Sequence, residues 1–226
     1  RNCDFEMMTE WKNPNPTNAY WAGFCAADGN LASKRSSFSL QLQKRDEDHL
    51  KLFKETVKFT GNIAEYKGYP TLNIGACAEW HKDLAEIWSI TPNKTFTLQP
   101  PKIEDPELIK SFLFGFINGD GWVTAKDQKK KCRLGIVNAS YTFLEWAKNQ
   151  IEKLFPVHKQ FEGKIPPLPL NIHKATDGNY YLLHIDGIRG LVIIDKFRNL
   201  TLPRLNRKWD KPEILSYIEE YKQKYP

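Results

Sequence analysis

Two aspartates, Asp28 and Asp120, have the residue type and the neighbours to bind a metal ion. Each is followed by glycine and stands at the predicted end of a helix, in the nine-residue segments 21–29 and 113–121. A carboxylate at that place opposes the helix macrodipole, and the last main-chain carbonyls add further negative potential. A hard cation such as Mg²⁺ would offset this charge. The chemistry indicated is metal-assisted attack on a phosphate ester, with two ions flanking the phosphate.

Small residues stand four positions apart in both segments, at Gly23 and Ala27 and at Gly115 and Gly119. Residues at this spacing share one helix face, and small side chains let two helix backbones approach closely. A glycine inside a helix costs about 1 kcal/mol relative to alanine, which close packing would offset. We therefore expect the two helices to pack side by side, with their aspartates near each other.

An Asp-Gly pair after a helix is also an ordinary C-cap and turn, so a single copy would be interpreted as structural. Two copies, each after a helix with a small-residue face and before a pair of strands, favour the functional interpretation.

The predicted elements occur twice in the order helix, two strands, helix, two strands, helix. The clearest strand is 37–43, where polar and apolar residues alternate strictly. The first half is predicted to contain a helix over 18–27 after the caps Pro16 and Thr17, the strand 37–43, a helix over 46–59 closed by Gly61, a hairpin of 62–67 and 71–76 with its turn at Gly68-Tyr69-Pro70, and a helix over 79–88.

A proline-containing linker at 91–102 separates the halves, so the domains are predicted as 1–98 and 99–226. This order predicts an α+β fold of two αββαββα halves. The second half is predicted to contain a helix over 107–119 capped by Asp105 with Pro106 at its first position, strands 122–126 and 132–138, a helix from the cap Ser140 to Phe155, strands 157–164 and 179–185, a short helix near Ile188, and a C-terminal helix that Pro212 opens.

The composition fits a folded protein with a phosphate-rich partner. Among 226 residues, Lys and Arg number 33 and Asp and Glu 27, a net charge of +6 that also suits an ordinary basic protein. No apolar stretch approaches the roughly 18 residues of a membrane span, and no signal peptide is visible. The four cysteines form no CxxC pair and the five histidines no metal-ligand cluster, so we expect reduced thiols, an intracellular protein and no zinc site.

At the two Asp-Gly segments the sequence resembles the LAGLIDADG homing endonucleases, whose nine-residue motif has an acidic eighth position, here Asp28 and Asp120. The duplicated order of elements fits the same family over nearly the whole chain. Three positions depart from the motif: Trp21 replaces the usual first Leu, and Ala26 and Asn118 replace the sixth-position Asp, which is not the catalytic one.

The resemblance implies a single-chain monomer whose halves form a pseudo-twofold saddle with antiparallel DNA-binding sheets, without an obligate protein partner. It implies an intron-encoded, site-specific homing endonuclease that hydrolyses both strands of a long asymmetric double-stranded DNA target. Asp28 and Asp120 would bind the metal ions, helped by the carbonyls of Ala27 and Gly119. Mg²⁺ is the implied cofactor, with Mn²⁺ as a substitute and Ca²⁺ supporting binding without cleavage.

The family usually keeps a basic residue and polar, water-organising residues near each carboxylate. Lys94 and Lys208 fit the basic role because each follows the last helix of its half, and Arg207 competes with Lys208. A lysine there would neutralise phosphate charge or organise the attacking water, although each could equally be an ordinary surface lysine. Gln43 and Asn138 fall at the ends of the second strands and could position water.

The polar face of strand 37–43 is predicted to enter the major groove of DNA, because Gln can bond adenine edges and Ser accepts either base. The second-half strand 134–137 is much less polar, so its reading face stays open. Basic turns suit phosphate contact, although a charge run is often only a solvated surface. The candidate DNA-binding residues are Lys34, Arg35, Ser37, Ser39, Gln41, Thr71, Asn73, Lys129, Lys130, Arg133, Lys159 and Lys164.

Two other functions fit parts of the pattern. The first is a catalytically silent or dual-function DNA- or RNA-binding protein of the same fold, such as an intron maturase or a regulator. The intact Asp28 and Asp120 argue against loss of cleavage and leave dual function open. The second is an unrelated metal-dependent phosphodiesterase, which would not need long polar strands with basic turns.

Overall fold

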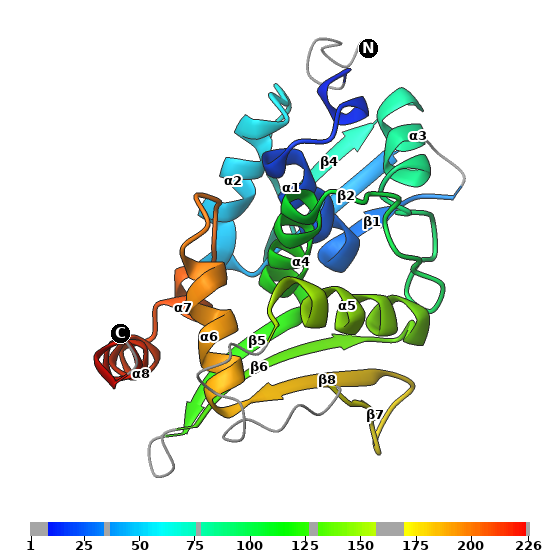
Figure 1. Cartoon of the computed structure of the whole chain (residues 1–226). Coiled ribbons are helices and arrows are strands. Elements are labelled where there is room, and N and C mark those ends of the chain that lie inside the picture. The colour runs from blue at the N-terminus through cyan, green and yellow to red at the C-terminus, as the bar shows by residue number, and fades with distance from the viewer. Residues whose placement is uncertain (1–8, 34–36, 76–77, 127–130, 157–169, 225–226) are drawn as a thin grey trace. The chain divides into compact units, whose positions relative to one another are not determined.

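The chain divides into two compact units, Arg1–Gly119 and Asp120–Pro226, each with one four-stranded antiparallel sheet (Figure 1). In the part of the chain that the structure describes, no helix is both long and apolar enough to cross a membrane. This computed structural model describes residues 9–33, 37–75, 78–126, 131–156 and 170–224.

The first unit is a sheet with helices packed on its apolar face. Its last helix, α4, ends one residue beyond the unit. The elements in chain order are the 3₁₀ helix η2 (Thr9–Lys12), α1 (Pro16–Asp28), β1 (Gly29–Leu31), β2 (Ser37–Gln41), the 3₁₀ helix η3 (Lys44–Asp46), α2 (Glu47–Thr56), β3 (Ala64–Tyr66), β4 (Tyr69–Gly75), α3 (Ala78–Glu86) and α4 (Pro106–Asp120).

Helices α1 and α4 pack closely through their small residues. A Cβ atom added at Gly23 would clash with the main-chain carbonyl of Phe112, and one added at Gly115 would clash with that of Tyr20. The rings of Tyr20 and Phe114 lie 5.7 Å apart in the same interface. The predicted side-by-side packing of these two helices is confirmed, because only glycine fits at either close approach.

Helix α1 begins at a capping box whose N-cap, Asn15, precedes the predicted caps. The Asn15 side chain accepts a hydrogen bond from the Asn18 N–H at 3.0 Å, and the Asn18 side chain accepts one from the Asn15 N–H at 2.8 Å. The prediction of Pro16 and Thr17 as caps is therefore wrong. Pro16 is the first helical residue, where its missing N–H would have no helical partner in any case.

The first sheet has the strand order β1-β2-β4-β3. As the alternation predicts, Phe38 and Leu40 of β2 are fully buried, whereas Ser39 and Gln41 are on the opposite face. Helices α1 and α2 contact the strands on the buried side (Figure 1). The outer face is therefore the polar one.

The hairpin that joins β3 to β4 turns at Lys67 and Gly68, whose φ values are 53° and 82°. Two consecutive residues with positive φ match the right-handed twist of the flanking strands. The predicted turn at 68–70 is therefore wrong, because Tyr69 already belongs to β4 and pairs with Tyr66.

Helix α2 is shorter than the predicted 46–59. It ends at Thr56, and Lys58 takes a left-handed conformation with φ 48°. Gly61 is therefore not its C-cap. A Cβ added at Gly61 would instead meet the ring of Phe59.

The second unit repeats this arrangement around the sheet β5-β6-β8-β7. The predicted cap Ser140 is confirmed, since its hydroxyl accepts a hydrogen bond from the Phe143 N–H at 3.3 Å. The elements are β5 (Gly121–Lys126), β6 (Lys131–Asn138), α5 (Tyr141–Leu154), β7 (Ile172–Lys174), β8 (Tyr181–Asp186), α6 (Gly187–Arg198), α7 (Asn206–Trp209) and α8 (Pro212–Lys224).

The apolar face of the second sheet is formed by alternate residues of β6 and β8. Leu134, Ile136, Leu183 and Ile185 are buried there, and helices α5 and α6 contact these strands (Figure 1). Strand β7 was not predicted, and the predicted strand 157–164 lies outside the described residues.

The predicted α+β fold with two αββαββα halves is confirmed, because α1–α3 and α4–α6 carry their strands in the same order. The compact units divide between Gly119 and Asp120, since α4 packs on α1 and so falls in the first unit. The boundary between residues 98 and 99 concerns the sequence repeat and stays a prediction.

Candidate active site

The first candidate centre is the C-terminal end of α1, where Asp28 is the last helical residue and its side chain is exposed. The N–H of Gly29 donates to the carbonyl of Cys25 and closes the helix. The ammonium of Lys94 donates to the carbonyl of Ala27 at 3.2 Å. One carboxylate, a terminal helix carbonyl and a lysine thus meet within the first unit.

Gly119 of α4 lies against this centre. A Cβ added at Gly119 would meet the methyl group of Ala27 and would lie 3.1 Å from the Oδ2 atom of Asp28. Any larger side chain would therefore crowd the carboxylate. The small-residue stripe of α4 continues to the residue just before Asp120.

The second candidate centre is the C-terminal end of α4, where Asp120 is the last helical residue and Gly121 begins β5. The ammonium of Lys208 donates to the carbonyl of Gly121 at 2.7 Å. Lys211 donates to the carbonyl of Val123 at 2.6 Å, two residues further along the strand. Sequence reasoning missed Lys211, although it stands three residues after Lys208.

Lys208 lies on the short helix α7, which buried and hydrogen-bonded residues anchor in the second unit. Trp209 of α7 is fully buried. Asp210 accepts hydrogen bonds from Arg198 at 2.8 Å and from Arg204 at 3.0 Å. Burial opposes ionisation of Asp210, but these hydrogen bonds outweigh it and hold the pKa of Asp210 below its usual value. Of the two competing basic residues, Lys208 contacts the main chain beside Asp120, whereas Arg207 is exposed.

The two predicted water-positioning residues do not occupy matching places. Gly29 pairs with Leu40 and Gly121 with Ile136, so the repeat aligns Leu40 with Ile136. Gln43 then corresponds to position 139 rather than to Asn138. Gln43 is exposed beyond the end of β2, and the side chain of Asn138 accepts a hydrogen bond from the Ser140 N–H at 2.8 Å.

The donor groups at the two helix ends fit a hard divalent cation. Asp28 and Asp120 carry the carboxylate oxygens, and Ala27 and Gly119 carry the main-chain carbonyls, that would serve as ligands. Mg²⁺ is commonly bound by one or two carboxylates together with waters and substrate phosphates. Among the described residues, no group of three or more His, Cys, Asp or Glu could hold a metal ion, so carbonyls, waters and phosphates would complete the coordination.

The two cysteines that the structure describes carry no reactive thiolate. Cys25 and Cys132 are buried and free. Burial raises the pKa of Cys132 to about 11 and that of Cys25 further, so both stay protonated at neutral pH. Among the described residues, the candidate reactive groups at this site are therefore the oxygen donors and the lysines.

The outer face of the first sheet carries several predicted DNA-binding residues. Ser39 of β2 pairs with Asn73 of β4, and Asn30 of β1 lies on its other side. Thr71 is 6% exposed, and its hydroxyl accepts a hydrogen bond from the Gln41 amide at 3.0 Å. Sequence reasoning missed Asn30, although it stands two residues after Asp28 and so alternates onto the outer face.

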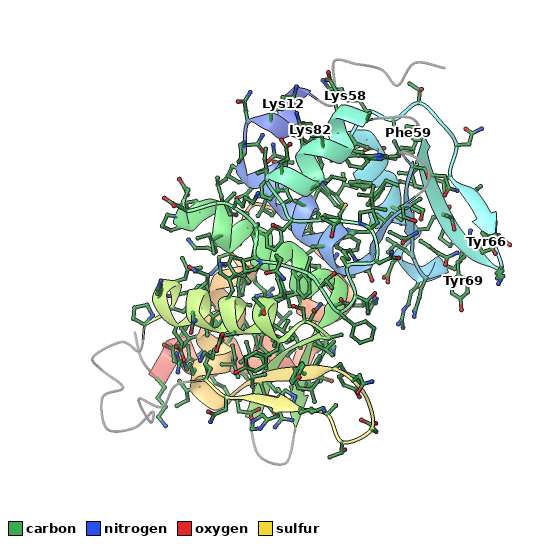
Figure 2. All side chains as sticks on the ribbon, turned by 90° about the vertical axis from the view of Figure 1, so that its right-hand side faces the viewer. Lys12, Lys58, Phe59, Tyr66, Tyr69 and Lys82 are labelled. Carbon is green, nitrogen blue, oxygen red and sulfur yellow. The ribbon has the colours of Figure 1, made fainter. Side chains whose placement is uncertain are left out.

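The β3–β4 hairpin ends in two exposed aromatic residues, Tyr66 and Tyr69, which pair across the strands. Figure 2 shows both at the tip of this hairpin. The ammonium of Lys67 lies 5.3 Å from the centre of the Tyr66 ring. A cation and two aromatic rings thus extend the polar face of the first sheet.

Arg133, the predicted contact on the second sheet, is engaged by Asp186 on the neighbouring strand. Its guanidinium donates to both carboxylate oxygens of Asp186, at 2.5 and 3.0 Å. Six other predicted phosphate contacts lie outside the described residues: Lys34, Arg35, Lys129, Lys130, Lys159 and Lys164.

Comparison with protein-family models and with curated proteins found no match to this sequence. Solved structures of similar fold include the LAGLIDADG homing endonuclease I-LtrWI bound to target DNA, with 15% identity, a TM-score of 0.55, and coverage of 95% of this chain and 99% of that chain. The LAGLIDADG meganuclease I-CpaMI bound to uncleaved DNA has 15% identity, a TM-score of 0.57, and coverage of 93% and 92%. I-AabMI, also bound to uncleaved DNA, has 14% identity, a TM-score of 0.57, and coverage of 93% and 92%. The chain therefore has the LAGLIDADG homing endonuclease fold, in agreement with the resemblance of its two motifs.

Proposed function

We propose that this protein is a site-specific endonuclease that hydrolyses both strands of a long, asymmetric double-stranded DNA target with divalent metal ions. The observation that carries the proposal is the pair of Asp-Gly helix ends. Helices α1 and α4 pack through small residues, each ends in an aspartate, and a lysine donates to a main-chain carbonyl beside each aspartate. A purely structural pair of turns would not need both a carboxylate and a lysine at each end.

Asp28 and Asp120 would each bind a metal ion, with the carbonyls of Ala27 and Gly119 as further ligands. Bound Mg²⁺ would supply activated water and stabilise the leaving oxygen. Two carboxylates leave most of the coordination to water and phosphate, which suits Mg²⁺ and accommodates Mn²⁺. Ca²⁺ would support DNA binding without cleavage.

Lys94 and Lys208 would offset phosphate charge at the reacting group. Each ammonium already lies at a main-chain carbonyl beside a motif aspartate, at 3.2 and 2.7 Å. A preorganised cation at the position where negative charge develops lowers the barrier without reorganisation during the reaction. Gln43 and Asn138 are the candidates to hold water, and their unmatched places predict that the two strands are cut at different rates.

The sheets would bind the duplex, and the chain would act as a monomer because it carries both halves. Ser37, Ser39, Gln41 and Asn73 present hydroxyl and amide groups on the outer face of the first sheet. Such groups pair with base edges in the major groove. The net charge of +6 favours a polyanionic partner.

The test is cleavage of duplex DNA carrying a site selected from a randomised library. With Mg²⁺ the protein should cut both strands, and with Ca²⁺ it should bind without cutting. Asp28→Asn and Asp120→Asn should each abolish double-strand cleavage while binding in Ca²⁺ persists, although nicking of one strand is allowed.

Asp48→Asn is the matched control, because it makes the same charge change at an exposed residue of α2. It should cut normally. Full double-strand cutting by Asp28→Asn or Asp120→Asn would contradict the metal assignment. Binding without cutting by the unaltered protein would instead indicate a maturase or a regulator of the same fold.

A further inference from the structure

The strand registers allow the outer faces of the two sheets to be compared row by row. Gly29 pairs with Leu40 in the first sheet, and Gly121 pairs with Ile136 in the second. Each of these pairs directly follows a motif aspartate. The rows of side chains next to them therefore occupy equivalent places in the two halves.

The row that begins two residues after Asp28 is polar throughout. It runs from Asn30 through Ser39 to Asn73 on three adjacent strands. The Asn30 amide reaches the Ser39 hydroxyl at 3.5 Å. Amide and hydroxyl groups both donate and accept hydrogen bonds, so this row suits polar base edges.

The equivalent row in the second sheet is aromatic. It runs from Trp122 through Gly135 to His184. A Cβ added at Gly135 would collide with the Trp122 indole, so the ring lies flat over this glycine. The rings of Trp122 and His184 lie 5.4 Å apart, edge to face, and those of His184 and His173 lie 6.2 Å apart.

This aromatic row has little charge of its own. Trp122 and His184 are both partly exposed on the sheet. Burial, followed by the charge of Arg133, lowers the pKa of His184, so its ring is neutral at pH 7. Arg133 is itself neutralised by Asp186 in the next row outward.

A second row shows the same contrast. Gln41 and Thr71 of the first sheet pair with each other, and the equivalent pair in the second sheet is Val137 and Leu182. Both aliphatic side chains are partly exposed. Two successive rows of the second sheet thus present apolar groups where the first sheet presents hydrogen-bonding ones.

We propose that the second sheet recognises the C5 methyl groups of thymine through Trp122, Val137 and Leu182, whereas the first sheet recognises polar base edges. This inference rests on the proposed function, since it requires duplex DNA on the outer faces. The thymine methyl is the apolar group that B-DNA displays in its major groove, and apolar side chains contact it. Trp122 is therefore a specificity-determining residue of the second half.

The experiment removes the methyl groups without changing hydrogen bonding. A duplex is selected from a randomised library for binding in Ca²⁺, and it is resynthesised with uracil in place of thymine in either half. Uracil in the half that contacts the second sheet should weaken binding about fourfold for each contacted methyl group. This is the change in affinity expected from the burial of one such group. Uracil in the other half should change the affinity by less than about twofold.

Two variants at equivalent positions assign the effect to its residue. Trp122→Ala should lose the share of the thymine preference that its own contact supplies, about fourfold, and keep the share from Val137 and Leu182. Asn30→Ala should keep the full preference for thymine. The comparison of uracil duplexes with the unaltered protein involves no variant, so it stands even if Trp122→Ala does not fold.

Equal sensitivity of both halves, insensitivity of both halves, or an undiminished thymine preference in a folded Trp122→Ala variant would each overturn the inference. Binding of DNA with no response to uracil would overturn this inference alone. Failure to select any duplex would overturn the proposed function as well.

Discussion

Single side chains decide which hydrogen-bonding groups the outer face of the first sheet leaves available to a partner. The Gln41 amide nitrogen donates to the Thr71 hydroxyl at 3.0 Å and to the Tyr66 carbonyl at 3.3 Å. With both amide hydrogens used within the sheet, Gln41 presents its carbonyl oxygen to a partner. Adenine N6 and cytosine N4 are the major-groove donors that such an acceptor can bind.

We therefore expect Gln41→Ala to relax base preference at one base pair. The loss should be about 0.5–1.5 kcal/mol of discrimination, the usual contribution of one hydrogen bond, rather than that of a bidentate contact. The measurement is the affinity for a panel of targets with single base changes. Thr71→Val removes the hydroxyl that orients Gln41 and should relax preference at the same base pair. Equal weakening of every target would contradict this orientation of the sheet.

The features of the candidate site residues differ in how far they could be predicted from the sequence. The places of Asp28 and Asp120 at two helix ends could be predicted, because a glycine and a repeated spacing both point to them. The burial of Thr71 could not, since it depends on the hydrogen bond from Gln41 on a neighbouring strand. The choice of Lys208 over Arg207 likewise depends on how α7 is held by Asp210.

At the scale of elements, the contact between α1 and α4 depends on two glycines. An alanine methyl at Gly23 would collide with the Phe112 carbonyl, and one at Gly115 with the Tyr20 carbonyl. Main-chain atoms cannot move aside as a flexible side chain can, so the helices would have to separate. Overpacking of this kind typically costs about 1–3 kcal/mol.

Gly23→Ala and Gly115→Ala should each lower the free energy of unfolding by about 1–3 kcal/mol. Helix propensity alone predicts the opposite sign, a gain of about 1 kcal/mol. Urea unfolding of both variants measures the difference. Gly75→Ala is the control, because a Cβ at that position meets nothing within 4 Å. A rise in stability for either helix variant would argue against close packing.

Helix α3 carries a carboxyl group in an unfavourable environment. Asp83 is 5% exposed, and its Oδ2 atom has no hydrogen-bond partner among the described residues. Burial raises the pKa of Asp83, although the charge of Lys12 opposes the rise. The pKa of Asp83 is therefore higher in the folded than in the unfolded state. As a result, the free energy of unfolding decreases as the pH rises through the folded-state pKa.

Asp83→Asn should therefore stabilise the protein at pH 7, because burial disfavours the carboxylate form that Asn does not have. The gain should shrink as pH falls to about 4, where the unfolded-state carboxyl also becomes protonated. Thermal unfolding of both proteins at the two pH values tests this, since 1 kcal/mol shifts Tm by about 2–4 °C in a chain of this size. A gain that does not depend on pH would show that ionisation of Asp83 is not its cause.

Most helices and strands could be predicted from local sequence patterns, whereas the pairing of the strands could not. The alternation in 37–43 predicted a strand with one apolar face, and Asp105 and Ser140 marked two helix starts. The aromatic row on the second sheet was missed, because Gly135 and Trp122 are far apart in sequence and become neighbours only through the register of β5 and β6.

At the scale of the whole molecule, the net charge and the outer faces of the two sheets should contribute differently to the proposed binding of DNA. The repeat places equivalent rows on both sheets, but one is polar and the other apolar, which favours an asymmetric target. In the proposed function, the net charge of +6 would contribute affinity for DNA without regard to base sequence. Base preference and salt dependence should therefore be separable by substitution.

The separation can be measured with two variants. Gln41→Ala should change base preference and leave the slope of log affinity against log salt nearly unchanged. Lys130→Ala, in the basic segment between β5 and β6 and outside the described residues, should weaken binding to all sequences alike. Loss of one phosphate contact should make that slope shallower by about one unit, because each neutralised phosphate releases about 0.9 counterion.

The measurement is the affinity for single-base target variants at several salt concentrations between about 50 and 200 mM, in Ca²⁺ so that no cleavage occurs. Each variant thus acts as the control for the other. If Lys130→Ala altered base preference while Gln41→Ala altered the salt slope, the basic segment would lie in the groove and the sheet against the phosphates. The assignment of the outer sheet faces to base recognition would then be wrong, whatever the activity of the metal site.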